Sequence, residues 1–179
     1  SLEETFHPSG KRIYSVRIIP YRGAWIEFES DVSDVIYAYI DRRRKILATT
    51  LLRAIGFSTT HDLLKALYPI EKVTDLESSP LKKLEGEYLA NDVLHPETKE
   101  PIAVAGTRLT KELLSVIGSN QVKSLQIVKL PGDDLSLINT LERDPYRTTE
   151  EAQIAIYRRI RPGDPPTPAS ARDLIQKLF

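Results

Sequence analysis

The sequence contains no cysteine and no methionine. Without cysteine, the chain cannot form disulfide bonds, use a thiolate nucleophile or hold a cysteine-ligated zinc ion. Because the chain lacks methionine and starts at Ser1, we expect it to be a piece of a longer protein. Apolar runs such as residues 46–48 are far shorter than the roughly 20 residues of a membrane helix. We therefore expect no membrane partner.

Positive and negative charges balance over the whole chain, but they are unevenly distributed along it. The formal net charge is zero, which by itself argues against strong nucleic-acid binding. Residues 10–53 nevertheless carry a balance of +4, whereas residues 54–140 carry −3. A hydrophobic content of 41% with 28% charged residues is ordinary for a folded domain. The basic character is therefore local, and the acidic middle is a candidate for a separate unit.

The first third of the chain has the alternation of β-strands. The turn signal at residues 20–23 separates two apolar-alternating stretches. Alternation in the second stretch places Trp25, Glu27 and Glu29 on one face and buries the other face. We expect an antiparallel meander. Its strands cover residues 13–20, 24–29 and 35–40.

Helical periodicity follows, with a different pattern in the middle of the chain. Residues 45–55 predict a helix that ends at Gly56, and Ser58 or Thr59 caps a second helix whose Leu63, Leu64 and Leu67 point inward. Residues 70–85 have the composition of a linker. Three further helices are expected at 135–141, 149–160 with Thr149 as its cap, and 167–179.

Between the linker and the later helices lies a compact β-β-α-β pattern. Its expected elements are strands at 88–90 and 101–105 around a turn at 95–98, a helix at 110–117 and a strand at 125–128. The fold class is therefore α+β, with antiparallel strands and packed helices interrupted by a small β-β-α-β insertion module. The expected division is 1–85 for the first part of the parent domain, 86–130 for the inserted module and 131–179 for the second part.

Three segments, in order, resemble the β subunit of bacterial DNA-directed RNA polymerase. They are residues 9–25 (SGKRIYS and RIIPYRGAW), residues 40–54 (IDRRRK, AT and LRA) and residues 156–167 (IYRRIRPGDPPT). Residues 86–128 more weakly resemble the small β–β′ module that varies in number within the same lobe of that subunit. The resemblance implies a lobe that forms one jaw of the DNA channel and faces the non-template strand and downstream DNA.

The cations from Arg42 to Lys45 are the first candidate DNA-binding residues. We expect these residues to lie between a strand and a helix N-terminus. Positive charge at that position opposes the helix dipole and is mildly unfavourable for folding, so it favours another role for Arg42, Arg43, Arg44 and Lys45. Exposed cations neutralise phosphates in a salt-dependent manner. The alternative is a solvated charge run in which Asp41 pairs locally, and the resemblance favours DNA contact. One or two of the four are expected to be structural, because neighbouring side chains point in different directions.

Trp25, the only tryptophan, is the second candidate, together with Arg22 in the preceding turn. An indole presented beside a turn can stack on an unpaired base. The alternative is a partly buried packing residue. The resemblance favours stacking, because Trp25 matches the family tryptophan that stacks on a non-template base near the start of downstream DNA.

No catalytic or metal site is expected in this chain. His7, His61 and His95 lack metal-ligand spacing, and no carboxylate cluster suits two-metal nucleotidyl transfer. The resemblance implies a non-catalytic part of a nucleotidyltransferase, with no cofactor here and Mg²⁺ held by the β′ subunit of the whole enzyme. It also implies a cytoplasmic protein whose partners are DNA, the rest of the β subunit, and the β′, α and sigma subunits.

A second function class stays open beside DNA contact. The acidic middle of the chain suits protein contact, so the alternative is an interaction module that docks sigma or other transcription regulators. An independent small enzyme is disfavoured, because the serines and threonines lack a plausible histidine partner. Nucleotide incorporation by the isolated chain would contradict that exclusion.

Overall fold

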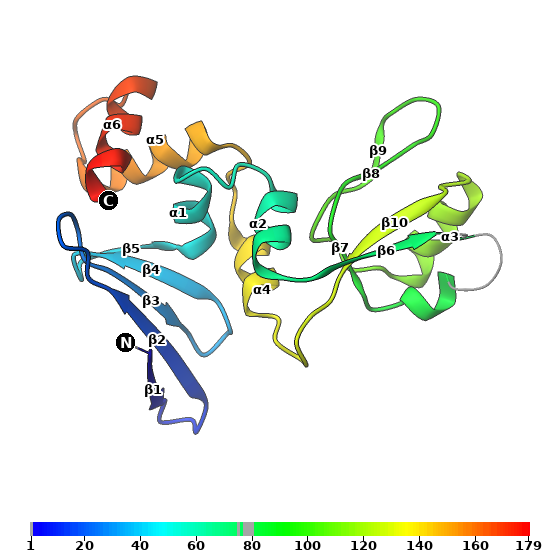
Figure 1. Cartoon of the computed structure of the whole chain (residues 1–179), viewed down its shortest axis with the longest axis horizontal. Coiled ribbons are helices and arrows are strands. Elements are labelled where there is room, and N and C mark those ends of the chain that lie inside the picture. Colours follow the sequence, from blue (N-terminus) through cyan, green and yellow to red (C-terminus); the bar gives the residue numbers. More distant parts are fainter. Residues whose placement is uncertain (1, 75, 77–80) are drawn as a thin grey trace. The chain divides into compact units, whose positions relative to one another are not determined.

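The computed structural model describes residues 2–74, 76 and 81–179, and it divides into two compact units (Figure 1). Unit 1 combines residues 1–59 with residues 134–179, and unit 2 comprises residues 60–133. Within the described residues, no helix has the length and apolar character needed to cross a membrane.

Unit 1 is built on an antiparallel sheet whose five strands follow one another in chain order. The expected meander is confirmed, and two strands that the sequence analysis did not identify extend it at both edges. In the central strands, period-two alternation fits a sheet of which one face packs on helices while the other stays open. The strands are β1 (Leu2–Phe6), β2 (Arg12–Ile18), β3 (Ile26–Ser30), β4 (Ile36–Ile40) and β5 (Arg44–Leu47).

The helix expected at residues 45–55 begins later than predicted. Its first residues belong to β5, which pairs with β4, and α1 covers only Ala48–Ala54. The apolar residues of a short strand that runs into a helix imitate helical spacing, which explains the error. Gly56, with φ of +131°, ends the helix as expected, and its N–H donates to the carbonyl of Arg53.

Helices cover one face of this sheet and form its core. Ile26, Ala38 and Ile40 pack against apolar residues of α1, α5 and α6. Thr148, one residue before the predicted cap, accepts a hydrogen bond from the N–H of Glu151 and completes a capping box with it. The remaining helices of unit 1 are α4 (Ser136–Arg143), α5 (Thr149–Ile160) and α6 (Pro168–Leu178).

A buried ion pair joins the two chain segments that make up unit 1. Nε of Arg53, in α1, donates to Oδ2 of Asp144 at 3.3 Å, and both side chains are 0% exposed. Nη1 of Arg53 also donates to the carbonyl of Ser58 at 2.8 Å. Burial lowers the pKa of Arg53, an effect that the neighbouring Asp144 carboxylate opposes. The pair links α1 to the loop after α4, two segments of unit 1 that unit 2 separates in the sequence.

Unit 2 is a small α+β body with its own core. Leu89, Ile117 and Ile127 lie at the centre of a buried apolar cluster. A three-stranded antiparallel sheet of order β6-β10-β7 is accompanied by the hairpin β8-β9. Its elements are α2 (Thr60–Leu67), β6 (Ile70–Thr74), η1 (Leu81–Leu84), β7 (Tyr88–Leu89), β8 (Val93–Leu94), β9 (Pro101–Ala103), α3 (Lys111–Ser119) and β10 (Ser124–Val128).

Three expectations for this region were wrong in part. The predicted linker contains β6 and η1, while residues 75 and 77–80 of it lie outside the described residues. Leu67, expected to point inward, is exposed at the end of α2. The turn at 95–98 connects β9 to β8, a strand that the sequence analysis did not identify, rather than to β7.

The compact units and the predicted domain boundaries describe different divisions. Unit 2 includes residues before 86, and one reason is that β6 pairs with β10 along its whole length and thereby joins residues on both sides of that boundary. The division at 86 and 130 concerns an inserted module, and it stays a prediction.

Candidate nucleic-acid interface

Two connections of the unit 1 sheet meet at one end of it. Ile26 in β3 pairs with Ile18 in β2 and with Ile40 in β4, and Ile40 in turn pairs with Arg44 in β5. The loop between β2 and β3 and the turn between β4 and β5 therefore emerge at the same end. These two connections carry four of the predicted DNA-binding residues, and the other two, Arg44 and Lys45, begin β5.

Asp41 holds Trp25 against the β4–β5 turn through two hydrogen bonds. The Trp25 N–H donates to Oδ1 of Asp41 at 3.0 Å, and the Asp41 N–H donates to the carbonyl of Trp25 at 2.9 Å. The guanidinium carbon of Arg42 lies 5.0 Å from the centre of the indole, within the range of a cation–π contact. Trp25 is 41% exposed, so its indole remains accessible to a further partner.

The turn itself has an unusual backbone. Asp41 and Arg42 have φ of 50° and 60°, and the Arg43 N–H donates to the carbonyl of Ile40 at 3.3 Å. These are features of a type I′ turn, in which arginine is disfavoured relative to asparagine or glycine. A side chain kept in a disfavoured backbone conformation is a hint of function. The expected position at a helix N-terminus was wrong, because Arg44 and Lys45 belong to β5 and α1 begins only at Ala48.

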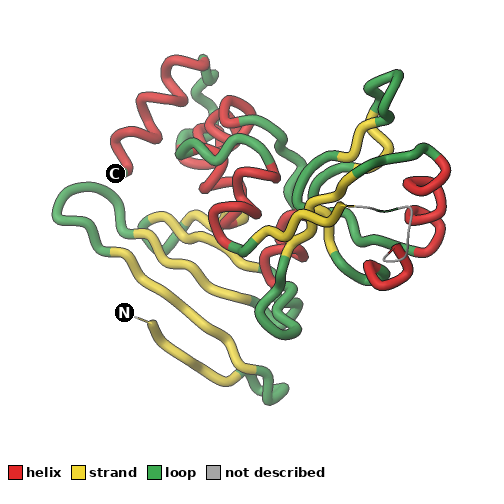
Figure 2. Tube along the Cα trace, turned by 45° about the vertical axis from the view of Figure 1, so that its right-hand side comes forward, coloured by secondary structure: helices red, strands yellow, loops and turns green. Residues whose placement is uncertain are grey.

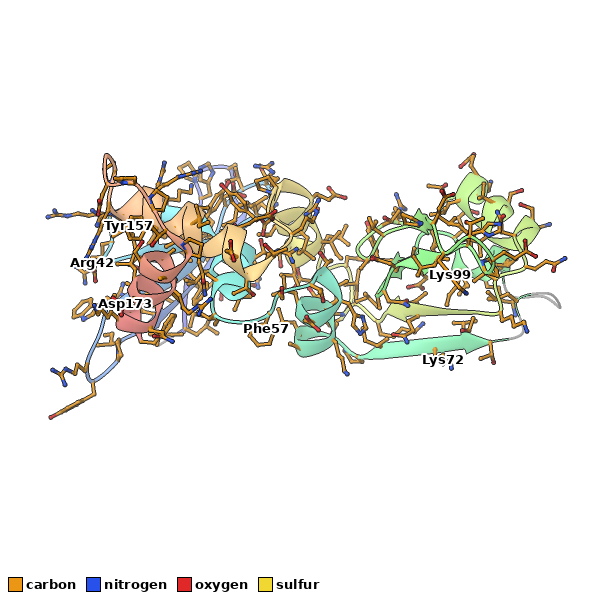
Figure 3. The ribbon with its side chains drawn as sticks, turned by 90° about the horizontal axis from the view of Figure 1, so that it is seen from above. Arg42, Phe57, Lys72, Lys99, Tyr157 and Asp173 are labelled. Carbon is orange, nitrogen blue, oxygen red and sulfur yellow. The ribbon has the colours of Figure 1, made fainter. Side chains whose placement is uncertain are left out.

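The four consecutive cations have different surroundings. Arg42 and Arg43 are exposed at the tip of the turn, and Figure 3 labels Arg42 at the margin of unit 1. Arg44 is half-buried, and its Nε donates to the carbonyl of Arg159 at 3.3 Å, which ties β5 to the end of α5. Nζ of Lys45 lies 3.8 Å from the ring centre of Tyr37. Arg42 and Arg43 are therefore the cations best placed for phosphate.

The open face of the sheet continues from the turn as a shallow hollow of about 460 Å³. Arg17, Glu27, Glu29, Tyr39 and Arg42 line it. Nη2 of Arg17 donates to Oε1 of Glu27 at 2.9 Å, and this hydrogen bond raises the pKa of Arg17. The pairing offsets the charge of Glu27, one of the two carboxylates that line the hollow.

A close backbone contact with α6 fixes the β2–β3 loop. The Ala24 N–H donates to the carbonyl of Leu178 at 3.1 Å. A Cβ atom on Gly23, which has φ of +125°, would lie 2.7 Å from that carbonyl oxygen. Only glycine fits this approach. Before it, Tyr21 is 108% exposed and Arg22 is exposed as well, so the loop presents an aromatic ring and a cation to solvent.

The structure thus brings some of the predicted residues together and separates others. Trp25 and Arg42 are in contact, while Arg22 and Arg43 are exposed at the same end of the sheet. None of the ion pairs among the described residues involves these three arginines. Arg44 and Lys45 make contacts within unit 1.

Sequence reasoning missed two residues of this site. Tyr21 lies in the turn signal PYRG, and an aromatic at a turn tip was the available signal. Asp41 was weighed only as a local partner of the cations, whereas it fixes the backbone of Trp25. Asp41 lies beside Trp25 because β3 pairs with β4, and the sequence alone does not show that pairing. No group of three or more His, Cys, Asp or Glu residues able to hold a metal ion occurs in the described part of the chain.

Comparison with known proteins decides the family. Residues 2–121 match the family model described as RNA polymerase Rpb2, domain 2. The chain belongs to this family. It is also 37% identical over 182 residues to the DNA-directed RNA polymerase subunit beta of Chlorobium chlorochromatii, a match that covers 98% of the chain. The corresponding subunit of Chlamydia trachomatis serovar L2 is 37% identical over 100% of the chain. That of Porphyromonas cangingivalis is 38% identical over 98% of it.

The chain spans only a small part of these relatives. It covers 14% of the Chlorobium and Chlamydia subunits and 15% of the Porphyromonas subunit. The family resemblance stated from the three sequence segments is confirmed, and the chain corresponds to a fragment of an RNA polymerase β subunit.

Proposed function

We propose that this chain is the part of an RNA polymerase β subunit that lines the DNA channel and contacts non-template or downstream DNA. The contact is made by the tip surface, defined as Trp25, Arg22, Arg42 and Arg43 with Tyr21. The observation that carries the proposal is the fixed position of an exposed indole beside an exposed arginine, held there by Asp41.

The tip surface suits a single strand better than a closed duplex. An unpaired base can stack on the exposed part of the indole, and such stacking contributes roughly 1–3 kcal/mol per base in other proteins. Arg42 already lies against the ring, so the base stacks on the part of the indole that the guanidinium leaves exposed. The exposed guanidinium groups of Arg22, Arg42 and Arg43 are then available to phosphates. In this proposal Arg44 holds β5 to α5, and Lys45 contacts the ring of Tyr37 in β4.

The remaining parts of the function belong to the whole enzyme. In this proposal the chain carries out no nucleotidyl transfer. It serves that reaction in the cytoplasm by holding DNA, while β′ holds Mg²⁺. Its protein partners are the rest of the β subunit and the β′, α and sigma subunits. The names of the relatives as subunits of DNA-directed RNA polymerase support this assignment.

The proposal predicts a localised effect on salt-dependent DNA binding. Replacing Arg42 and Arg43 together with glutamine is expected to weaken binding of a fluorescein-labelled single strand. The slope of log affinity against log salt should fall by about 1 to 1.5, because each phosphate contact with a single strand contributes about 0.7. Fluorescence anisotropy titrations of the 179-residue chain at several salt concentrations measure this slope.

The matched control removes the same charge elsewhere. Lys72 and Lys99 are exposed in unit 2 (Figure 3), and their replacement with glutamine should leave the slope unchanged. Equal slopes for the Arg42/Arg43 variant and the original chain would contradict the tip surface as the DNA contact. That result would favour the alternative, in which the acidic unit 2 docks sigma or another transcription regulator.

A further inference from the structure

One row of apolar side chains crosses the whole sheet of unit 1. The strand register aligns Leu2, Val16, Phe28, Ala38 and Ile46, one residue from each strand. Cross-strand partners point to the same face, so all five belong to the face that carries the helices. The exposed fraction is 0% at Ala38, 38% at Val16 and 71% at Leu2. The row of apolar residues continues to β1, but the helices cover it only as far as β3, so Val16 in β2 and Leu2 in β1 are exposed.

The neighbouring row repeats this behaviour. Ile18, Ile26 and Ile40 are aligned, and the latter two are buried while Ile18 is 49% exposed. Helices α1, α5 and α6 supply the buried cluster over β3 and β4. In Figure 2 the strand that carries the N-terminus, β1, forms the free edge of the sheet. We define the uncovered stripe by its exposed large apolar residues: Leu2, Phe6, Tyr14, Val16 and Ile18.

The opposite face of the same two strands has the reverse character. There Ser15 and Arg17 are aligned with Glu29 and Glu27. From Tyr14 to Ile18, the alternation of β2 therefore points its polar side chains to the open face and its apolar ones to the helix face. This is the pattern of a strand whose helix face is buried, although in this chain that face is exposed. A DNA strand does not suit the stripe, since the rest of its surface is apolar and Arg12, the cation of β2 on this face, is already paired with Glu4 at 3.3 Å.

We propose that another part of the same β polypeptide covers the uncovered stripe with an apolar surface. The relatives supply the reason, because the chain covers only 14% or 15% of their length and most of the polypeptide lies outside it. The stripe is also continuous with the core of unit 1, so its cover extends an existing hydrophobic core. Contiguous exposed apolar patches of this kind mark interaction surfaces in folded proteins.

Cysteine labelling tests this proposal directly, because the chain contains no cysteine. Val16→Cys and Leu2→Cys are introduced separately into the 179-residue chain, into the full-length β subunit, and into the assembled polymerase. Maleimide labelling rates are read from the mass of the modified peptide. In the isolated chain both sites should react readily. In the full-length β subunit alone, both should react at least about tenfold more slowly, as expected for burial in a packed interior.

Ser119→Cys is the control, since Ser119 is exposed at the end of α3 and lies outside unit 1. Comparable reactivity of this control in the isolated chain and the full-length subunit would show that the loss is local. Equal rates at Val16→Cys in all three forms would overturn the proposal. Protection that appears only in the assembled polymerase would also overturn it, in favour of another subunit. Protection that rises with concentration of the isolated chain would overturn it in favour of a second copy.

Discussion

Replacing Asp144 with alanine is expected to lower the free energy of unfolding of unit 1 by about 3–5 kcal/mol. The reason is the burial of its partner, because Arg53 is 0% exposed and would lose the carboxylate that offsets its charge. Oδ1 of Asp144 also accepts a hydrogen bond from the Tyr146 N–H at 3.0 Å, which the substitution removes. Urea denaturation followed by tryptophan fluorescence measures the effect in unit 1, since Trp25 is the only tryptophan.

Two further variants identify the cause. Asp173→Ala breaks the exposed pair between Lys177 and Asp173, and it should cost no more than about 1 kcal/mol. Replacing Arg53 with methionine and Asp144 with leucine together should give a more stable chain than Asp144→Ala, because no buried charge remains without its partner. If Asp144→Ala were no more destabilising than Asp173→Ala, the buried pair would not be the link between the two segments of unit 1.

Gly23→Ala is expected to destabilise unit 1 by about 2–4 kcal/mol, through backbone strain and a lost hydrogen bond. The new Cβ would lie 2.7 Å from the backbone oxygen of Leu178, so the loop and the end of α6 have to separate. The bond from the Ala24 N–H to that oxygen would then be lost. Because the loop leads directly to Trp25, the emission spectrum of the folded state should shift as well. Urea denaturation and the native emission spectrum measure the two effects.

The control for this variant is Gly10→Ala. Gly10 also has a positive φ, of +84°, but a Cβ there would have nothing within 4 Å. Its substitution should cost about 1–2 kcal/mol, from conformation alone, and leave the native emission spectrum unchanged. Equal costs for both alanine variants would show that the approach of the loop to α6 does not constrain the tip surface.

Local patterns in the sequence predicted most elements of the fold. Alternation identified three strands of the unit 1 sheet, and turn and capping residues identified the helix that Gly56 ends and the one that starts near Thr148. Element boundaries at residues 45–47 were wrong, because a short strand running directly into a helix keeps an apolar spacing that fits both structures. The strand β6, read as linker, is stabilised by pairing with β10, which lies about fifty residues later.

The candidate site was predictable by residue type but not by arrangement. The sequence indicated that Trp25 and the arginines are unusual, and the family resemblance gave them a role. Which arginine faces the indole depends on the type I′ turn and on the Asp41 hydrogen bonds, and both require the strand register. For the same reason the sequence did not show that Arg44 is tied to the carbonyl of Arg159.

The fluorescence of Trp25 during DNA titration tests the central claim most directly. The account predicts that a saturating single strand changes the emission of the 179-residue chain and protects the indole from acrylamide, because a base stacks on its exposed part. Saturation is established independently by anisotropy of the labelled strand. If the strand is bound while the emission and the quenching of Trp25 stay those of the free chain, the tip surface is not where this protein holds DNA.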